Sequence, residues 1–321
     1  MASTVEVSPW LGAVLASTLP HVSNTNHHAE FKLSITKALA DQLSAALKKL
    51  TPAPLTAEVI DVLPKGPGVY QLYLDGQPVY VGKASKSLPT RLRKHYRKLS
   101  GRPITGEVSF VCLYLEEDLE ASAPEKMLLG KYEGKYERAD GEPAQKLPWN
   151  NNGFGNNDPG RRRDTSEVAA NHFDALYPVN LDLTIDWLTA GVRPVGKVLT
   201  ELKDNLPYNL RFEQPKNSTR ARHDYKLNVE VPSHPMTVRA ALQLVVGALP
   251  EGWQGTALPG YLILYYENTS YNSAQCWWRR SGSEVIETPG PALFAPATDI
   301  VEEPDEDDEG SRDNGNEEIE T

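Results

Sequence analysis

Two tyrosines, an arginine and a histidine stand at a spacing that can bring four reactive groups together. Tyr70 ends the triplet Gly-Val-Tyr, and Tyr80 opens the triplet Tyr-Val-Gly ten residues later. Arg91 and His95 lie four residues apart and would share one face of a helix. A phenol, a guanidinium and an imidazole can position water, bind a phosphate and move a proton. Taken singly, strand tyrosines are more often packing residues and an Arg–His helix pair is usually a solvated face, so only the combination points to chemistry.

The segments that must position these residues predict a small layer of strands and helices. Asp75–Gly76–Gln77 separates two β-rich runs, and its Asp-Gly pair favours a tight hairpin. Pro124 stands in the first turn of a predicted helix, where its missing N–H is not needed. The predicted order is a strand at 68–74, a strand at 78–82, a basic helix at 87–99, a strand at 109–115 and a helix at 124–136. We expect the helices to cover one face of the sheet.

This ordered set of residues resembles a known family. GVY, YVGKA, RLRKH and a later Glu125 within APEK resemble the motif of the GIY-YIG nuclease superfamily, over about residues 64–152. The resemblance implies an α/β (α+β) fold with a small antiparallel sheet flanked by helices. CLYLEEDLEASAPEKMLL, followed by PWNNNGFGNNDPGRRR, resembles the restriction-endonuclease branch of that superfamily, and the His four residues after the Arg also suits that branch.

The resemblance implies a role for each candidate side chain. Tyr70, with Lys83 as a second cation beside it, would deprotonate or position the attacking water, because an unaided phenol, with a pKa near 10, is rarely ionised at neutral pH. Tyr80 and His95 would hold the water and the phosphate in line, with His95 relaying the proton. Arg91 would bind two oxygens of the scissile phosphate.

A metal ligand and an amide complete the implied site. Glu125 would bind one Mg²⁺ per active site, with Mn²⁺ as a possible substitute, because one or two carboxylates besides phosphate and water suffice for this ion. Its other interpretation is an acid favoured by the helix dipole, and that of Arg91 is a phosphate contact without catalysis. Asn150 is preferred as the catalytic amide because it directly follows Trp149. Four neighbours compete with it, namely Asn151, Asn152, Asn156 and Asn157.

Basic residues around the candidate site predict a nucleic-acid partner. Pro64–Pro103 holds nine Lys or Arg and a single acid, Asp75, which gives a local charge of +8. Contacts to DNA phosphates are predicted for Lys86, Arg93, Lys94, Arg97, Lys98 and Arg102. For reading guanine the candidates are Arg161, Arg162 and Arg163, with a run of phosphate contacts as an equal alternative.

Together these features predict a metal-dependent, sequence-specific endonuclease that hydrolyses phosphodiester bonds of double-stranded DNA, as a type II restriction enzyme does. The family implies products with a 5′-phosphate and a 3′-hydroxyl. A homodimer is expected, since two-fold protein symmetry matches a palindrome, and no nucleotide cofactor is expected. The nearest alternative is a structure-selective repair or mobile-element nuclease. The alternative of another class is a DNA-binding module without catalysis.

Composition agrees with a cytoplasmic protein. The chain is 40% hydrophobic and 24% charged, and no apolar run reaches the roughly 18–20 residues that a membrane-spanning helix needs. The N-terminus lacks the basic start of a secretory signal. Cys112 and Cys276 are expected to be reduced, structural thiols. The net charge of −10 belongs to the tail, because residues 298–321 hold twelve acids and one Arg, which leaves +1 for residues 1–297.

Four parts are expected along the chain. They are an N-terminal helical segment at 1–55 with a helix at 31–50, a nuclease domain at 56–178 with a Gly/Asn-rich loop, a C-terminal α+β unit at 179–296 and a disordered acidic tail at 297–321. The C-terminal unit predicts helices at 195–206 and 237–249 and strands at 225–231 and 261–266, while its role is not disclosed. Its tryptophans are expected in the core.

Overall fold

The computed structural model describes residues 35–115, 122–134, 146–156, 160–298 and 300. Most of the predicted segment 1–55 and nearly all of the predicted acidic tail therefore lie outside the described residues. The elements of the first part are α1 (Ile35–Lys48), β1 (Ala53–Pro54), α2 (Ala57–Asp61), β2 (Gly68–Leu74), β3 (Gln77–Ala84), α3 (Leu88–Ser100), β4 (Val108–Tyr114), α4 (Ser122–Tyr132), the 3₁₀ turn η1 (Gly160–Arg163) and α5 (Phe173–Leu176).

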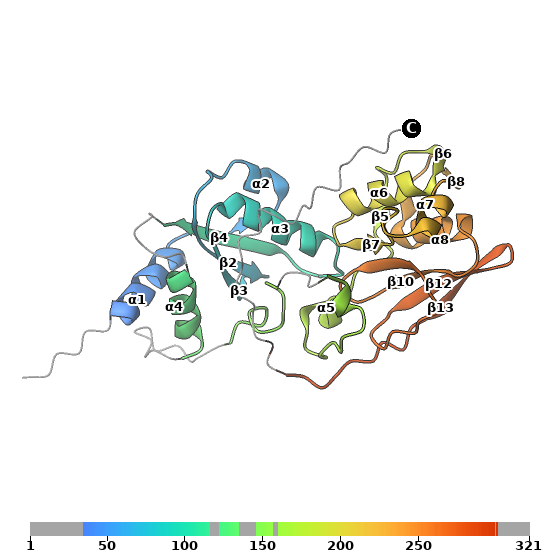
Figure 1. Ribbon diagram of the computed structural model, residues 1–321. Coiled ribbons are helices and arrows are strands. Elements are labelled where there is room, and N and C mark those ends of the chain that lie inside the picture. Colours follow the sequence, from blue (N-terminus) through green and yellow to red (C-terminus); the bar gives the residue numbers. More distant parts are fainter. Residues whose placement is uncertain (1–34, 116–121, 135–145, 157–159, 299, 301–321) are drawn as a thin grey trace, which may run out of the picture. The chain divides into compact units, whose positions relative to one another are not determined.

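A four-stranded antiparallel sheet carries the candidate tyrosines (Figure 1). Its order is β1-β4-β2-β3, so β2 is central and β3 lies at an edge. The predicted hairpin is confirmed: β2 pairs with β3, and the turn residues Asp75 and Gly76 have positive φ, at 49° and 76°. Two successive residues at positive φ make the type I′ turn that matches the twist of a hairpin, which explains why Asp-Gly stands there.

Apolar side chains cover both faces of this sheet. Tyr70 and Tyr80 pack with α3 on one face, and Val69 and Val81 of the same strands pack with α1 and α4 on the other. The expectation that helices cover one face is therefore wrong. β2 carries Val69 and Tyr70 at consecutive positions, and consecutive strand residues point to opposite faces, so burying both requires a helical layer on each side.

Helix α3 forms for the reason its sequence suggests. The side chain of Ser87 accepts a hydrogen bond from Thr90 N, and Pro89 occupies the first turn, where it costs no helical hydrogen bond. Leu88, Leu92 and His95 are buried at the spacing of one helix face. This face turns Arg91 and His95 toward the sheet.

The second part of the chain is built around a five-stranded sheet of order β13-β12-β10-β11-β7, in which only the pair β11 and β7 is parallel. Two-stranded ribbons pair β5 with β9 and β6 with β8. The elements are β5 (Thr184–Ile185), β6 (Gly191–Pro194), α6 (Val195–Asn205), β7 (Leu210–Phe212), α7 (Thr219–Asp224), β8 (Asn228–Val231), β9 (Met236–Thr237), α8 (Val238–Ala248), β10 (Trp253–Ala257), β11 (Leu262–Tyr266), β12 (Cys276–Ser281) and β13 (Glu284–Pro289). The α+β class is confirmed, as are the predicted helices α6 and α8.

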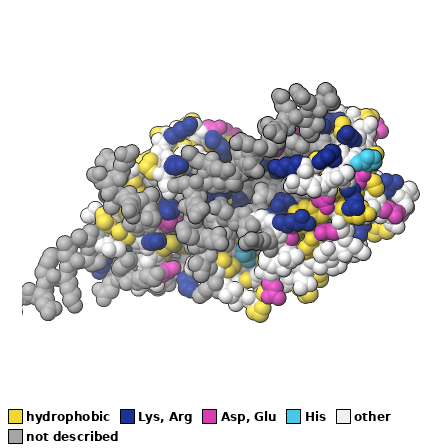
Figure 2. Space-filling view, in the orientation of Figure 1, with side chains coloured by type: hydrophobic (Ala, Val, Ile, Leu, Met, Phe, Trp, Pro, Cys, Tyr) yellow, Lys and Arg dark blue, Asp and Glu magenta, His cyan; other side chains and the backbone are white. Residues whose placement is uncertain are grey.

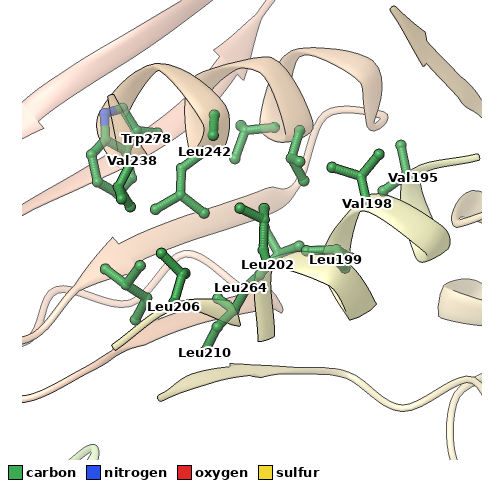
Figure 3. Close-up of a cluster of buried hydrophobic side chains, with 14 of the residues drawn as sticks. Val195, Val198, Leu199, Leu202, Leu206, Leu210, Val238, Leu242, Leu264 and Trp278 are labelled. Carbon is green, nitrogen blue, oxygen red and sulfur yellow. The ribbon is translucent and has the colours of Figure 1, made fainter. Parts of the chain in front are cut away.

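One large core holds this second part together. Apolar side chains of α6 and α8 interdigitate with those of the sheet, as Figure 3 shows for Leu199, Leu202, Leu242, Leu264 and Trp278. The expectation for the tryptophans is confirmed, since Trp253 and Trp278 are fully buried and Trp277 is 9% exposed. Buried clusters between Leu47 and Phe173 are separate from those between Val179 and Trp278. The predicted boundary near residue 178 stays a prediction, because the chain from Thr36 onward forms one unit by its contacts.

None of the helices among the described residues is long and apolar enough to cross a membrane. Both cysteines are free, Cys112 half-buried and Cys276 buried. Burial raises the pKa of the Cys276 thiol to about 12, so it stays protonated and serves as a small core residue.

Candidate active site

The hydroxyl of Tyr70 lies at the centre of a buried polar group. It is 2.6 Å from His95 Nε2, and Arg91 Nε donates a hydrogen bond to it over 3.2 Å. Tyr70 comes from the central strand β2, whereas Arg91 and His95 come from α3. The structure thus brings together three of the predicted residues, 21 and 25 positions apart, around one phenol oxygen.

Glycine at position 82 permits this arrangement. Gly82 stands directly opposite Tyr70 in the β2–β3 register. A Cβ atom there would lie 2.4 Å from Tyr70 Oη and 2.7 Å from Tyr80 Cε1, closer than real side chains approach. Gly68 is restricted in the same way, since its Cβ would lie 2.2 Å from Leu113 O. The two glycines of the sequence motif are therefore required by close approach rather than by a turn.

His95 sits in an aromatic enclosure. Its ring centroid is 5.4 Å from those of Tyr70 and Tyr80, and the ring of Phe154 stacks on it at 4.7 Å with 19° between the planes. Burial first, and then the positive charges of Arg91, Lys98 and Lys94, hold the pKa of His95 well below 6.5.

The neutral ring fixes the direction of the hydrogen bonds. A neutral imidazole has one nitrogen that can accept. Arg91 already donates to the phenol oxygen of Tyr70, so we assign the phenol hydrogen to the bond toward His95 Nε2, with the ring proton on Nδ1. In this assignment Tyr70 donates to the histidine and accepts from the arginine.

Arg91 has a second contact. Its Nη2 donates a long hydrogen bond, over 3.4 Å, to Gly155 O in the Gly/Asn-rich loop. The guanidinium is half-buried between the phenol and this loop. It is held in position without an acidic group at either of these two contacts.

Asn150 has a structural role that differs from the predicted catalytic one. It is 2% exposed, its Oδ1 accepts from Val81 N at 2.9 Å, and its Nδ2 donates to Val81 O at 2.8 Å. Trp149 N donates to Val79 O at 2.9 Å. The two residues therefore pair with the free edge of β3 as a further strand would, and the amide is fully used in holding the strand that carries Tyr80.

The competing asparagines are placed differently. Asn152 is buried, and its Oδ1 accepts from Phe154 N at 3.2 Å, which shapes the loop beneath His95. Asn151 and Asn156 are partly exposed, and Asn157 lies outside the described residues. The sequence could not separate these residues because the decisive contacts are with β3, about seventy residues earlier.

Lys83 and Glu125 belong to the other side of the sheet. Lys83 is paired with Val69, so its side chain points to the face of α1 and α4, and the expectation that it lies beside Tyr70 on the same face is wrong. Glu125 is half-buried in the first turn of α4, one turn before Leu128, whose side chain packs on that face. α4 contacts β3, the strand of Tyr80 and Lys83.

No group of three or more His, Cys, Asp or Glu side chains suited to a metal occurs in the described part of the chain. Glu125 supplies one hard oxygen ligand, and Mg²⁺ needs only one or two protein carboxylates when phosphate and water complete its shell. The donor set therefore fits Mg²⁺ on substrate rather than a closed structural metal site.

Four of the six cations predicted to contact DNA phosphates have partners within the fold. Arg97 donates to Leu206 O and Asp204 O at the end of α6, over 2.6 and 2.8 Å from Nη2. Lys98 donates to Phe154 O at 2.7 Å and lies over the rings of Phe154 and Phe173. Arg97 is exposed while it makes these contacts and Lys98 is half-buried, so the predicted DNA contacts of both stay predictions.

Arg102 and Arg93 are likewise paired within the chain. The side chain of Arg102 is 2% exposed and forms an ion pair with buried Asp174 at 2.9 Å, while it also donates to Tyr177 O and Pro259 O. Arg93 forms an ion pair with Asp61 at the surface. A buried guanidinium of this kind cannot reach a DNA phosphate, so the expectation for Arg102 is wrong.

The remaining predicted cations are exposed or outside the described side chains. Lys86 and Lys94 are exposed. Arg161, also exposed, lies over the ring of Tyr265 at 4.5 Å. The side chains of Arg162 and Arg163 lie outside what the structure describes.

Two residues of this site were not predicted from the sequence. Phe154 stacks on His95, and Gly155 accepts from Arg91. The available signal was an aromatic residue between two glycines in a long polar loop, which is unusual unless the ring packs elsewhere in the fold.

No protein-family model matches the chain, and a search of curated proteins finds no significant match. What the chain does must be inferred from its own residues.

Proposed function

We propose that the protein is a metal-dependent endonuclease that hydrolyses phosphodiester bonds of double-stranded DNA, with a GIY-YIG-like site. The observation that carries the proposal is the buried Tyr70 hydroxyl between the imidazole of His95 and the guanidinium of Arg91. Packing alone does not require this set, because a phenylalanine would fill the same space without two polar partners. Activation of a water beside a phosphate needs a cation, a phenol and a neutral base in contact, and Arg91, Tyr70 and His95 supply these groups.

The contacts support a division of labour among these residues. When a water approaches, the phenol proton passes toward His95 Nε2, and the phenol oxygen, held by Arg91 Nε–H, accepts a proton from the water. Burial and three cations lower the basicity of His95 in the free protein. A phosphate anion bound at Arg91 offsets part of that positive field and makes the histidine a better base only when substrate is present.

Arg91 binds the phosphate in this proposal. Its Nη2 makes a long contact to Gly155 O, which a phosphate oxygen can replace with a stronger, charge-assisted bond. Tyr80, 2% exposed and packed at 5.0 Å on Phe154, fixes the wall of the site next to the histidine.

Glu125 would hold Mg²⁺ from the opposite helical layer. The ion supplies Lewis-acid stabilisation of charge on the phosphate and the leaving oxygen. Trp149 and Asn150 cover the edge of β3 at Val79 and Val81. In this proposal the substrate would therefore pass β3 beyond them, at Lys83 and Ala84, to reach the tyrosine face and the Glu125 face of that strand. Lys83, on the Glu125 side, would contact phosphate there.

The finer proposal is a type II restriction enzyme in the cytoplasm that cuts both strands of a palindrome as a homodimer. Digestion of unmethylated phage DNA in Mg²⁺, followed by sequencing of the fragment ends, tests it. Fixed fragments with 5′-phosphates support this proposal. Cutting only at branched or nicked DNA favours a structure-selective nuclease.

A matched pair of variants tests catalysis. Tyr70→Phe removes the hydroxyl from the site, while Tyr73→Phe removes a hydroxyl from the other face of the same strand. We expect cutting to fall by about 10²–10⁴-fold in the first and little in the second. Equal, weak cutting by wild type, Tyr70→Phe and Glu125→Ala, with DNA binding retained in all three, would show a binding module without catalysis.

A further inference from the structure

A cationic surface surrounds α7 in the second part of the chain. Five exposed basic side chains stand within eleven residues, and we call them the α7 basic surface: Lys216, Arg220, Arg222, His223 and Lys226. Figure 2 shows Lys and Arg side chains, together with a His, over the region where Figure 1 labels α7. Residues 214–227 contain four Lys or Arg and one acid, Asp224.

The helix beneath this surface is firmly anchored. Ala221 and Tyr225 are buried in the main core of the second part. The hydroxyl of Ser218 accepts from Ala221 N at 3.2 Å and donates to Glu213 at 2.8 Å. The buried side is thus apolar and capped, so the basic residues at the other positions point to solvent.

The acids near this surface bind groups of the fold, and Asp224 also contacts His223 of the surface, with 3.0 Å between His223 Nδ1 and Asp224 Oδ1. Trp253 Nε1 donates to Asp224 Oδ2 at 2.8 Å, and Asp224 is 7% exposed. Glu213 accepts from Tyr266 N and from Ser218. Since both carboxylates bind groups of the fold, the positive charge of Arg222 and Lys226 is not locally neutralised by them.

One aromatic residue adds to the surface. The guanidinium of Arg220 lies 3.5 Å from the ring centroid of Tyr266, which is 40% exposed. Stacking of this kind holds the arginine flat and leaves its N–H groups available at the rim. The surface therefore offers fixed cations with few apolar groups, which suits a polyanion rather than an apolar groove or a lipid layer.

We propose that the α7 basic surface binds the phosphate backbone of duplex DNA and that the second part of the chain serves to hold the substrate. This rests on the proposed DNA endonuclease function and gives it a binding surface apart from the tyrosine site. Arg222 lies in the last turn of α7 and Lys226 in the turn that follows the helix, and both side chains are exposed. On α3, Arg97 and Lys98 donate to backbone carbonyls of the fold.

Salt dependence of DNA binding tests the proposal. Binding of a labelled duplex is measured by anisotropy in Ca²⁺, without Mg²⁺, at several salt concentrations. The double variant Arg222→Gln/Lys226→Gln is compared with Lys49→Gln/Lys203→Gln, which removes two exposed cations from α1 and α6 regions. We expect the slope of log affinity against log salt to fall by about 1–2 in the first variant and to stay near wild type in the control.

The outcomes separate this inference from the proposed function. Equal salt slopes for the two double variants would overturn the inference and would indicate that the surface binds another anionic partner. A wild-type protein that binds no duplex would overturn it as well. A wild-type protein that binds DNA with the expected salt slopes but never cuts it would contradict the endonuclease proposal and still support the binding surface. All four side chains are exposed, so equal thermal unfolding midpoints are the check that folding is intact.

Discussion

The ring of Phe154 stacks on the imidazole of His95, with centroids 4.7 Å apart and 19° between the planes. Phe154 comes from a glycine-rich loop 59 residues after the histidine, and Lys98 from the histidine's own helix binds the loop carbonyl at Phe154. The stack closes one side of the ring to water, so Nε2 is left facing Tyr70. The loop is therefore part of the catalytic geometry in the proposed enzyme.

Phe154→Leu should lower the rate of DNA cleavage strongly and the free energy of unfolding only moderately. The smaller side chain keeps the core apolar but removes the flat surface against His95, and we expect at least a tenfold loss of cleavage. Phe173→Leu is the matched control, because Phe173 packs at 4.7 Å on Phe154 in the same cluster. Both variants should cost about 1–2 kcal/mol in urea unfolding. Equal loss of cleavage in the two would mean that Phe154 acts through stability alone.

Gly82→Ala should disrupt the phenol pair. The added Cβ would lie within 2.7 Å of both tyrosine rings, which are buried and cannot move freely. We expect about 1–3 kcal/mol lower unfolding free energy and loss of cleavage. Gly247→Ala in α8 is the control, since its Cβ meets only Val285 Cγ2 at 3.1 Å and a helical glycine gains propensity. Wild-type cleavage by Gly82→Ala would contradict the close approach.

Stability should depend on pH through His95. Its pKa is held well below 6.5 in the folded protein, while the unfolded chain titrates near 6.5. Below pH 6.5 the unfolded chain binds one more proton than the folded protein. As the pH is lowered, the free energy of unfolding therefore decreases by up to about 1.4 kcal/mol per pH unit. Above pH 6.5 the full contribution of neutral His95 to stability is present. His95→Gln removes this term. Urea unfolding between pH 5 and 8 should show wild type losing more stability toward acid than the variant; parallel curves would exclude a neutral, buried His95.

Asn150→Asp should weaken the edge of β3. A carboxylate can still accept from Val81 N but cannot donate to Val81 O, and it would be buried against that carbonyl. We expect a loss of about 2–4 kcal/mol, measured by chemical unfolding. Asn151→Asp, at a partly exposed neighbour, should cost less than about 1 kcal/mol. A small effect at Asn150 together with abolished cleavage would instead support the catalytic role expected from the sequence.

Arg102→Met should destabilise the protein strongly. It leaves Asp174, whose side chain is 4% exposed, without its guanidinium partner, and the loss of one member of a buried pair costs about 3–5 kcal/mol. Arg93→Gln breaks an exposed pair with Asp61, so it should cost under about 1 kcal/mol. Thermal unfolding of both variants distinguishes these roles. Similar midpoints would show that Arg102 is not structurally required.

The amino-acid sequence was sufficient for the local elements of the tyrosine site. Two β-rich runs and an Asp-Gly turn predicted β2 and β3, and helical spacing predicted α3. These features depend on neighbours in the chain, which is why they can be predicted. The strands β10 and β12 of the second sheet were missed: β10 is buried at every position and β12 at its first three, so neither has an alternating pattern.

By itself the sequence determined which chemical groups were available: two phenols, a guanidinium, an imidazole and a carboxylate in a fixed order. Only the tertiary structure decided their partners. Strand register directs Lys83 away from Tyr70, and Asn150 binds the edge of β3. Phe154 stacks on His95, and Arg102 is buried in an ion pair. The reason is physical: a long polar side chain reaches whichever buried acceptor needs it, and that acceptor can lie more than a hundred residues away.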